Sequence, residues 1–183
     1  MATGFTRLLK RVRRRFRGAD EGVTAIEFAL VGGPFIWLLC VVFETGIMLF
    51  AEYSIENGTA QAGRLIRTGQ VQTEGMSESK FKSIVCGQLT GFLDCANKLY
   101  VDVRHFPNFQ SIELPPSHDG GQLSPQVTTG SQFQPGSQRD VVVVRAFYDW
   151  QLFTPGVTLL ANLAGGRRVL TGATAFRNEP YAN

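Results

Sequence analysis

Residues 22–51 read GVTAIEFALVGGPFIWLLCVVFETGIMLFA, and the architecture of the chain follows from them. Between Phe28 and Ala51 the single charged residue is Glu44. About 24 residues of helix, at 1.5 Å each, measure roughly 36 Å, which is enough to cross the hydrocarbon core of a bilayer. This run therefore predicts a transmembrane helix, which we place at residues 23–51.

The residues before this helix are strongly basic. Residues 1–22 hold seven lysines and arginines against Asp20 and Glu21, a net charge of +5, so the remainder of the 183-residue chain carries −2 of the total of +3. The positive-inside rule then places the N-terminus in the cytoplasm and residues 52–183 in the periplasm. Because the basic charge is confined to this leader, we expect no nucleic-acid partner for the periplasmic part.

Glu27 is a carboxylate at the start of the apolar helix, where a charged group is costly unless it has a partner or a function. It is the fifth residue after Gly22. This layout resembles the leader of type IV prepilins, and Glu27 with residues 28–31 (FALV) resembles the opening of TadE-like pseudopilins of tight-adherence pilus systems. The resemblance implies that a prepilin peptidase cuts between Gly22 and Val23, and that Glu27 pairs with the new amino terminus of a neighbouring subunit. The alternative is a signal anchor in which Glu27 only favours the helix N-terminus through the macrodipole.

The end of the chain carries a second resemblance. Residues 175–181 (AFRNEPY) are similar to the tail of TadE-like proteins, and residues 148–150 (YDW) look like part of the penultimate strand of that family. Arg177 and Glu179 share one face of the last predicted strand, so we expect them to pair. The alternative is that this tail only terminates the strand, which Pro180 ends by removing a donor.

Beyond the membrane segment, the hydrophobic spacing predicts an α+β fold, with helices packed on an antiparallel sheet of three or four strands. The chain thus divides into a leader at 1–22, the membrane helix at 23–51, and a periplasmic stem helix with its α+β domain at 52–183. The stem continues as an amphipathic helix to Thr68, and its small residues at 58–63 suit either a neighbouring helix or the protein's own sheet.

The other expected elements follow from local composition. Proline at position 34, after two glycines, predicts a kink or a melted turn in the membrane helix. The loop at Pro107–Arg139 is expected to be either functional or partly disordered, because it is long and has no hydrophobic period. Residues 141–150, apolar on both faces, predict the central strand. The remaining expected elements are a linker at 69–75, a helix at 77–93, a strand at 99–104, a short helix at 157–163 and a last strand at 168–176.

Two of the three cysteines, Cys86 and Cys95, lie in what this orientation makes an oxidising compartment, so we expect a disulfide rather than two free thiols. Nine residues of helix would separate them by about 13.5 Å, whereas bridged cysteines have Cα atoms roughly 4.4–6.8 Å apart. The chain must therefore fold back between them, for which Gly87 and Gly91 are suited. Cys40, in the apolar run, is expected to be a small buried residue.

The sequence contains no motif for an enzyme, a metal site or a cofactor site, and we expect none. Ser117-His118-Asp119 is contiguous, whereas the members of a catalytic triad come from separate segments. We expect Glu44, near the outer interface, to reach water. The favoured function is that of a minor pilin or pseudopilin in tight-adherence type IV pilus assembly, with the expected partners being a prepilin peptidase, other minor and major pilins, the inner-membrane assembly platform and the membrane. The alternative is a membrane-anchored periplasmic binding or scaffold protein that captures a ligand with Pro107–Arg139.

Overall fold

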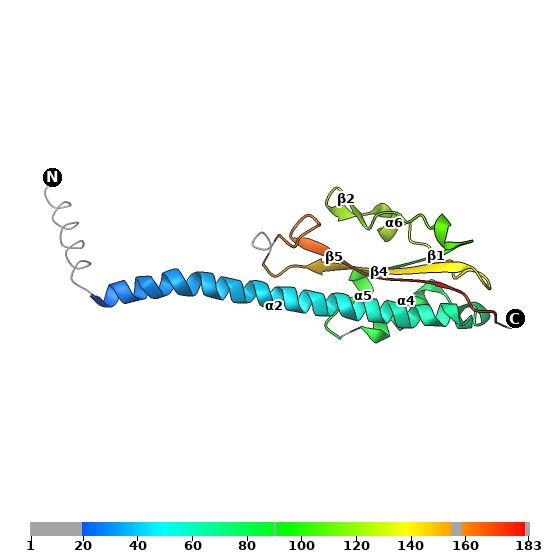
Figure 1. Cartoon of the computed structure of the whole chain (residues 1–183), viewed down its shortest axis with the longest axis horizontal. Helices are drawn as coiled ribbons and strands as arrows, with labels where there is room; N and C mark the ends of the chain where they lie inside the picture. The colour runs from blue at the N-terminus through cyan, green and yellow to red at the C-terminus, as the bar shows by residue number, and fades with distance from the viewer. Residues whose placement is uncertain (1–19, 90, 155–158, 182–183) are drawn as a thin grey trace. The chain divides into compact units, whose positions relative to one another are not determined.

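The structure, a computed structural model, describes residues 20–89, 91–154 and 159–181 (Figure 1). The chain divides into two compact units, Met1–Phe43 and Glu44–Asn183. The elements, in chain order, are α2 (Asp20–Arg67), α3 (Gln70–Thr73), α4 (Glu78–Gln88), α5 (Cys95–Lys98), β1 (Leu99–Phe106), η1 (Phe109–Ser111), β2 (His118–Asp119), β3 (Gln122–Leu123), α6 (Pro125–Thr128), β4 (Val141–Gln151) and β5 (Arg167–Arg177).

The described part of the first unit is the N-terminal part of α2. Its side chains are almost all exposed, including large apolar ones such as Phe28 and Leu30. From Gly22 to Arg67 the helix is long and apolar enough to cross a membrane. Helix α2 runs through Pro34 without interruption, so the melted turn is wrong as a prediction and the kink stays a prediction.

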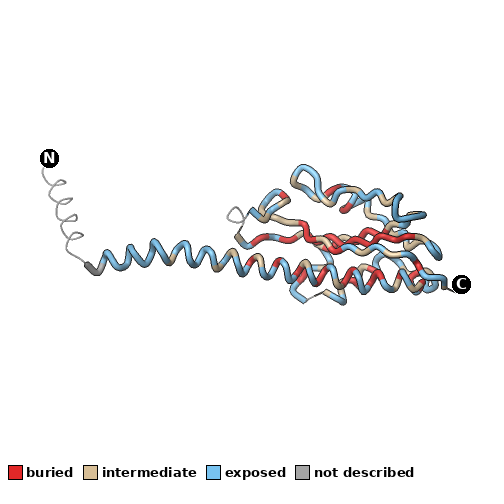
Figure 2. The backbone as a smooth tube through the Cα atoms, in the orientation of Figure 1, coloured by how far each residue is buried: buried red, intermediate tan, exposed pale blue. Residues whose placement is uncertain are grey.

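The second unit is built on a three-stranded antiparallel sheet in the order β1-β4-β5. In the central strand, Val144 lies opposite Val103 of β1 and Thr174 of β5. This confirms the expected central strand and the α+β class. One face of the sheet packs on α2 and α4, and Figure 2 shows the buried residues concentrated in these strands and along the helix. The core of this face includes Ile55, Ile66, Phe81, Val85, Val101, Val142, Ala146, Tyr148, Trp150 and Leu170.

Two glycines allow α2 and β5 to approach closely. A Cβ added at Gly172 would lie 2.8 Å from the carbonyl oxygen of Ile55, and one added at Gly63 would lie 2.8 Å from Cγ2 of Thr174. Both distances are shorter than real contacts, so a larger residue would force the two elements apart. The structure shows both kinds of partner expected for the small residues of the stem: Gly63 lies against the protein's own sheet, and Gly58 lies against the neighbouring helix α4.

Three expected elements differ from the structure. The linker at 69–75 contains the helical turn α3, whose Val71 is buried in the core. Helix α4 stops at Gln88, because Leu89 adopts an extended backbone, so Phe92 and Leu93 lie outside it. Of the short helix expected at 157–163, residues 157 and 158 fall outside the described residues, and residues 159–163 form turns and an isolated bridge.

The segment 107–139 covers the other face of the sheet. It contains η1, the small hairpin β2–β3 and α6, and Val127 of α6 is fully buried against Phe147 and Val169 of the sheet. At the edge of β1, the amide of Val103 donates to the carbonyl of Gln132 at 2.7 Å. The segment is therefore an ordered third layer of the domain, and it shields an apolar face that would otherwise meet water.

Candidate functional site

The bond predicted to be cut, between Gly22 and Val23, lies in the first turns of α2, and Val23 is exposed. The basic residues 7–17 of the leader lie outside the described residues. A peptide bond must be extended to fit a protease cleft, so cutting here requires the start of α2 to unwind. Gly22 lowers the cost of that step, because glycine is among the weakest helix formers.

Glu27 is exposed on α2 between Ile26 and Phe28, whose side chains are also exposed. Among the residues that the structure describes, none makes a hydrogen bond or an ion pair with its carboxylate. An ionised group on an apolar helix surface needs a partner if lipid or protein surrounds it. Glu27 is therefore available to a group from outside the described residues.

Glu44, the other acid of the apolar run, has the opposite environment. Its side chain is buried, and its carboxylate accepts hydrogen bonds from the amides of Phe153 and Thr154 and from the hydroxyl of Thr154. The expectation that Glu44 reaches water is wrong. The loop after β4 supplies three donors, which satisfy the charge inside the fold. An isolated charge in an apolar run was the available signal, but its partner is more than a hundred residues away in sequence.

Cys86 and Cys95 form a disulfide, with their Cα atoms 5.8 Å apart. As the spacing required, the chain folds back between them, because α4 ends at Gln88 and α5 begins at Cys95. The bridge thus ties the end of α4 to the start of the segment that leads into β1. Cys40 is free and exposed, so the expectation that it is buried is wrong within a single chain.

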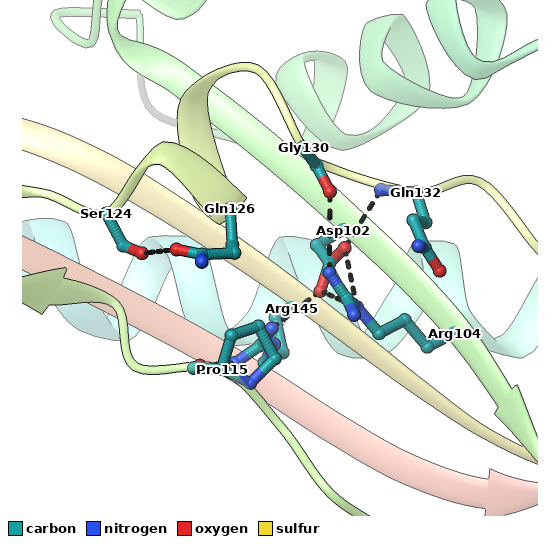
Figure 3. Close-up of polar contacts among 8 residues, drawn as sticks. All are labelled: Asp102, Arg104, Pro115, Ser124, Gln126, Gly130, Gln132 and Arg145. Atoms are coloured by element: carbon teal, nitrogen blue, oxygen red, sulfur yellow. Dashed lines mark hydrogen bonds and ion pairs between the residues drawn. The ribbon is translucent and has the colours of Figure 1, made fainter.

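A buried ion network holds residues 107–139, which we call the covering layer, onto the sheet (Figure 3). Asp102 of β1 accepts hydrogen bonds from Arg104 at 2.9 Å, from Arg145 of β4 at 2.6 Å and from the amide of Gln132 at 2.9 Å. Arg145 also donates to the carbonyl of Pro115 at 2.8 Å. Two points of the covering layer are therefore attached to the carboxylate of Asp102. Gln132 binds it directly, and Pro115 binds it through Arg145.

The electrostatics of this network favour the ionised carboxylate. Burial acts to raise the pKa of Asp102, but the hydrogen bonds from Arg104 and Arg145 outweigh it and hold the pKa below its usual value of 3.8. The alternation of Asp102 with Val101 and Val103 is typical of a half-buried strand with Asp102 on its water-facing side, but Asp102 is buried. The four consecutive valines at 141–144 were the signal that both faces of the sheet are buried.

The C-terminal tail closes the fold around the end of α2. Glu179 pairs with Arg67 at 2.9 Å, and its amide donates to the carbonyl of Arg67. Arg177 instead lies over the ring of Phe109, so the predicted pairing of Arg177 with Glu179 is wrong. Asn178 is buried and donates to the carbonyls of residues 135 and 137. The tail therefore does more than terminate a strand.

The described part of the chain shows no group of three or more histidines, cysteines, aspartates or glutamates placed to hold a metal ion. Ser117 and His118 are in contact, with Oγ and Nδ1 3.1 Å apart, in an exposed turn of the covering layer. Neither observation assigns a reaction to the protein.

A comparison with family models finds a match in the N-terminal part of the chain. The model described as TadE-like protein matches residues 22–64, which begin at the glycine of the predicted cut and include Glu27. No curated protein and no solved structure matches the chain. The match supports a role in the Tad pilus system and a general association with pilus components, and the one N-terminal apolar helix is that of a single-pass membrane anchor. Residues 22–64 are thus similar to TadE-like proteins.

Proposed function

We propose that this chain is a minor pilin or pseudopilin that a prepilin peptidase processes and that takes part in assembling a tight-adherence pilus. The observation that carries the proposal is the contrast between the two acids of the apolar run. Glu44 is satisfied by three donors of its own chain, whereas Glu27 is exposed with no partner among the described residues. Glu27 also lies in the segment that matches TadE-like proteins.

Cutting after Gly22 would give Glu27 a matching partner. Val23 would then carry a free amine, and Glu27 of one subunit can offset the amine of a neighbour in a low-dielectric setting, where such a pair is stronger than in water. Because each charge alone is costly there, the pairing also fixes the register between neighbouring subunits. This step needs no catalytic group in the chain, and the proposed role is structural rather than enzymatic.

The proposed location is the inner membrane, with the N-terminus in the cytoplasm and residues 52–183 in the periplasm. The basic leader supports this orientation through the positive-inside rule. The disulfide between Cys86 and Cys95 supports it independently, because such bonds persist in the periplasm and are rare in the cytoplasm. The proposed partners are the prepilin peptidase, other minor and major pilins and the inner-membrane assembly platform.

The alternative, a membrane-anchored binding protein, would use residues 107–139 to capture a ligand. In the structure this segment is held against the sheet by Val127 and by the Asp102 network, and it protects a buried face. That arrangement supports a structural layer more than a capture loop. The alternative also assigns no role to Gly22 or to Glu27.

The test compares Glu27→Ala with Glu56→Ala, which removes an exposed acid from the same helix inside the second unit. Glu27→Ala should keep the protein level and the disulfide of the unaltered chain but abolish piliation in cells that otherwise make the pilus. Glu56→Ala should support normal piliation. Normal piliation by Glu27→Ala, or a defect explained by lower protein abundance, would reject the assembly role of Glu27.

A further inference from the structure

The second unit carries three exposed phenylalanines at one end of its sheet, which we call the aromatic rim: Phe50, Phe92 and Phe153. Their exposures are 53%, 53% and 69%. They surround Trp150, which is buried: the ring centroids of Phe92 and Phe153 lie 6.3 and 6.1 Å from that of Trp150, and Phe50 stacks on Phe92 at 6.3 Å. Three distant parts of the chain thus build one apolar surface.

The rim continues the apolar surface of α2. Within the second unit, Ile47, Leu49 and Tyr53 are also exposed on this helix. The amides of Phe153 and Thr154, just after β4, donate to Glu44, so the end of the sheet where β4 stops lies alongside this part of α2. Further along α2, the exposed residues include Glu56 and Arg64. The change from apolar to charged side chains therefore comes just beyond the rim.

Of the two acids of α2 nearest the rim, Glu44 is turned inward and Glu52 is half-buried. Glu44 is 3% exposed, and its donors are the amides of Phe153 and Thr154 and the hydroxyl of Thr154. The loop that carries Phe153 of the rim thus removes the charge of Glu44 from the surface with its own backbone. An apolar surface that carries exposed phenylalanines and from which the charge of Glu44 is withdrawn suits the boundary between lipid headgroups and acyl chains.

The depth of the rim agrees with a lipid partner. About 20 helical residues cover a hydrocarbon core roughly 30 Å thick. Within the membrane helix at 23–51, a hydrocarbon core that begins at Phe28, directly after the acid Glu27, therefore ends near Ile47. Phe50 lies three residues further, or about 4.5 Å beyond that boundary, in the headgroup region. We propose that the aromatic rim lies in the outer headgroup interface of the same bilayer that α2 crosses, a proposal that rests on the membrane topology of the proposed function.

The test uses Trp150 as a reporter beneath the rim. The chain has two tryptophans, so Trp37→Phe leaves Trp150 as the only one. The full chain carrying this substitution is reconstituted into phosphatidylethanolamine–phosphatidylglycerol vesicles, in which part of the lipid is brominated close to the headgroup. We expect the brominated lipid to quench Trp150 emission. In a variant that adds Phe92→Ser and Phe153→Ser, this loss of emission should be much smaller, provided that the Cys86–Cys95 disulfide is intact.

A control chain carrying Trp150→Phe reports on Trp37, inside the predicted span. If brominated lipid quenches Trp37 but leaves Trp150 unchanged, the rim faces water or another protein, and the inference is wrong while the membrane span stands. If neither tryptophan is quenched, the membrane span and the inference fail together. If the rim variant is quenched as strongly as its parent, proximity to α2 rather than the rim explains the signal, and the inference is again wrong.

Discussion

The substitution Asp102→Asn tests whether the buried ion network holds the covering layer. The side chain of Asp102 is 1% exposed, and it faces the guanidinium groups of Arg104 and Arg145. The side chain of Arg145 is 8% exposed. Asparagine keeps the volume but removes the negative charge, which leaves Arg145 buried without its counter-ion. Breaking a buried pair in this way costs about 3–5 kcal/mol of stability, a large part of the roughly 5–15 kcal/mol of a whole domain.

The assay is urea unfolding of the detergent-solubilised full chain, combined with hydrogen exchange of residues 107–139. Asp102→Asn should lower the free energy of unfolding by about 3–5 kcal/mol and increase exchange in the covering layer. Adding Arg145→Met should restore much of the loss, since the unpaired charge is gone. The matched control is Glu179→Gln, which breaks an exposed pair with Arg67 and should cost less than about 1 kcal/mol.

The pH dependence gives an independent check. Because the pKa of Asp102 is lower in the folded chain than its usual 3.8, its ionised form contributes stability above that value, and the contribution is lost as the pH falls through the folded pKa. Asp102→Asn should therefore flatten the acid limb of the stability curve. If the free energy of unfolding of Asp102→Asn lies within about 1 kcal/mol of that of the unaltered chain, and if its stability falls with acid in the same way, the network does not hold the covering layer.

Two further tests probe the second unit, one at its glycines and one at its disulfide. Gly172→Ala should destabilise it by about 1–3 kcal/mol in the same unfolding assay, because the added Cβ would lie 2.8 Å from the carbonyl oxygen of Ile55, whereas Gly87→Ala, with no atom within 4 Å of the added Cβ, should be neutral or slightly stabilising. Equal stabilities of the two variants would contradict the close approach of helix and sheet. Replacing Cys86 and Cys95 together by serine should cost about 2–3 kcal/mol, since the bridge closes a loop with a sequence separation of 9. A recovery of both cysteines as free thiols from native protein, by rapid alkylation and mass mapping, would remove the basis of that figure.

The membrane helix and the central strand were predicted correctly because each has a continuous hydrophobic pattern in the sequence. The apolar run to Ala51 gave the membrane helix, and the valines at 141–144 gave the central strand, because burial on both faces leaves a continuous apolar signature. The contacts of Glu44 and Asp102 could not be read in the same way, since their partners are far away in sequence. The covering layer at 107–139 was missed because it is held by a few anchoring contacts rather than by a hydrophobic period.

The N-terminus of the mature chain tests the central claim most directly. The protein is purified from membranes of cells with an active prepilin peptidase, and its N-terminus is determined by mass spectrometry. The account predicts a chain that begins at Val23, and it predicts that Gly22→Val stays uncut, because a bulky side chain disturbs the cleft of the protease while meeting no atom within 4 Å in the fold. A chain that keeps residues 1–22 in such cells would contradict the account.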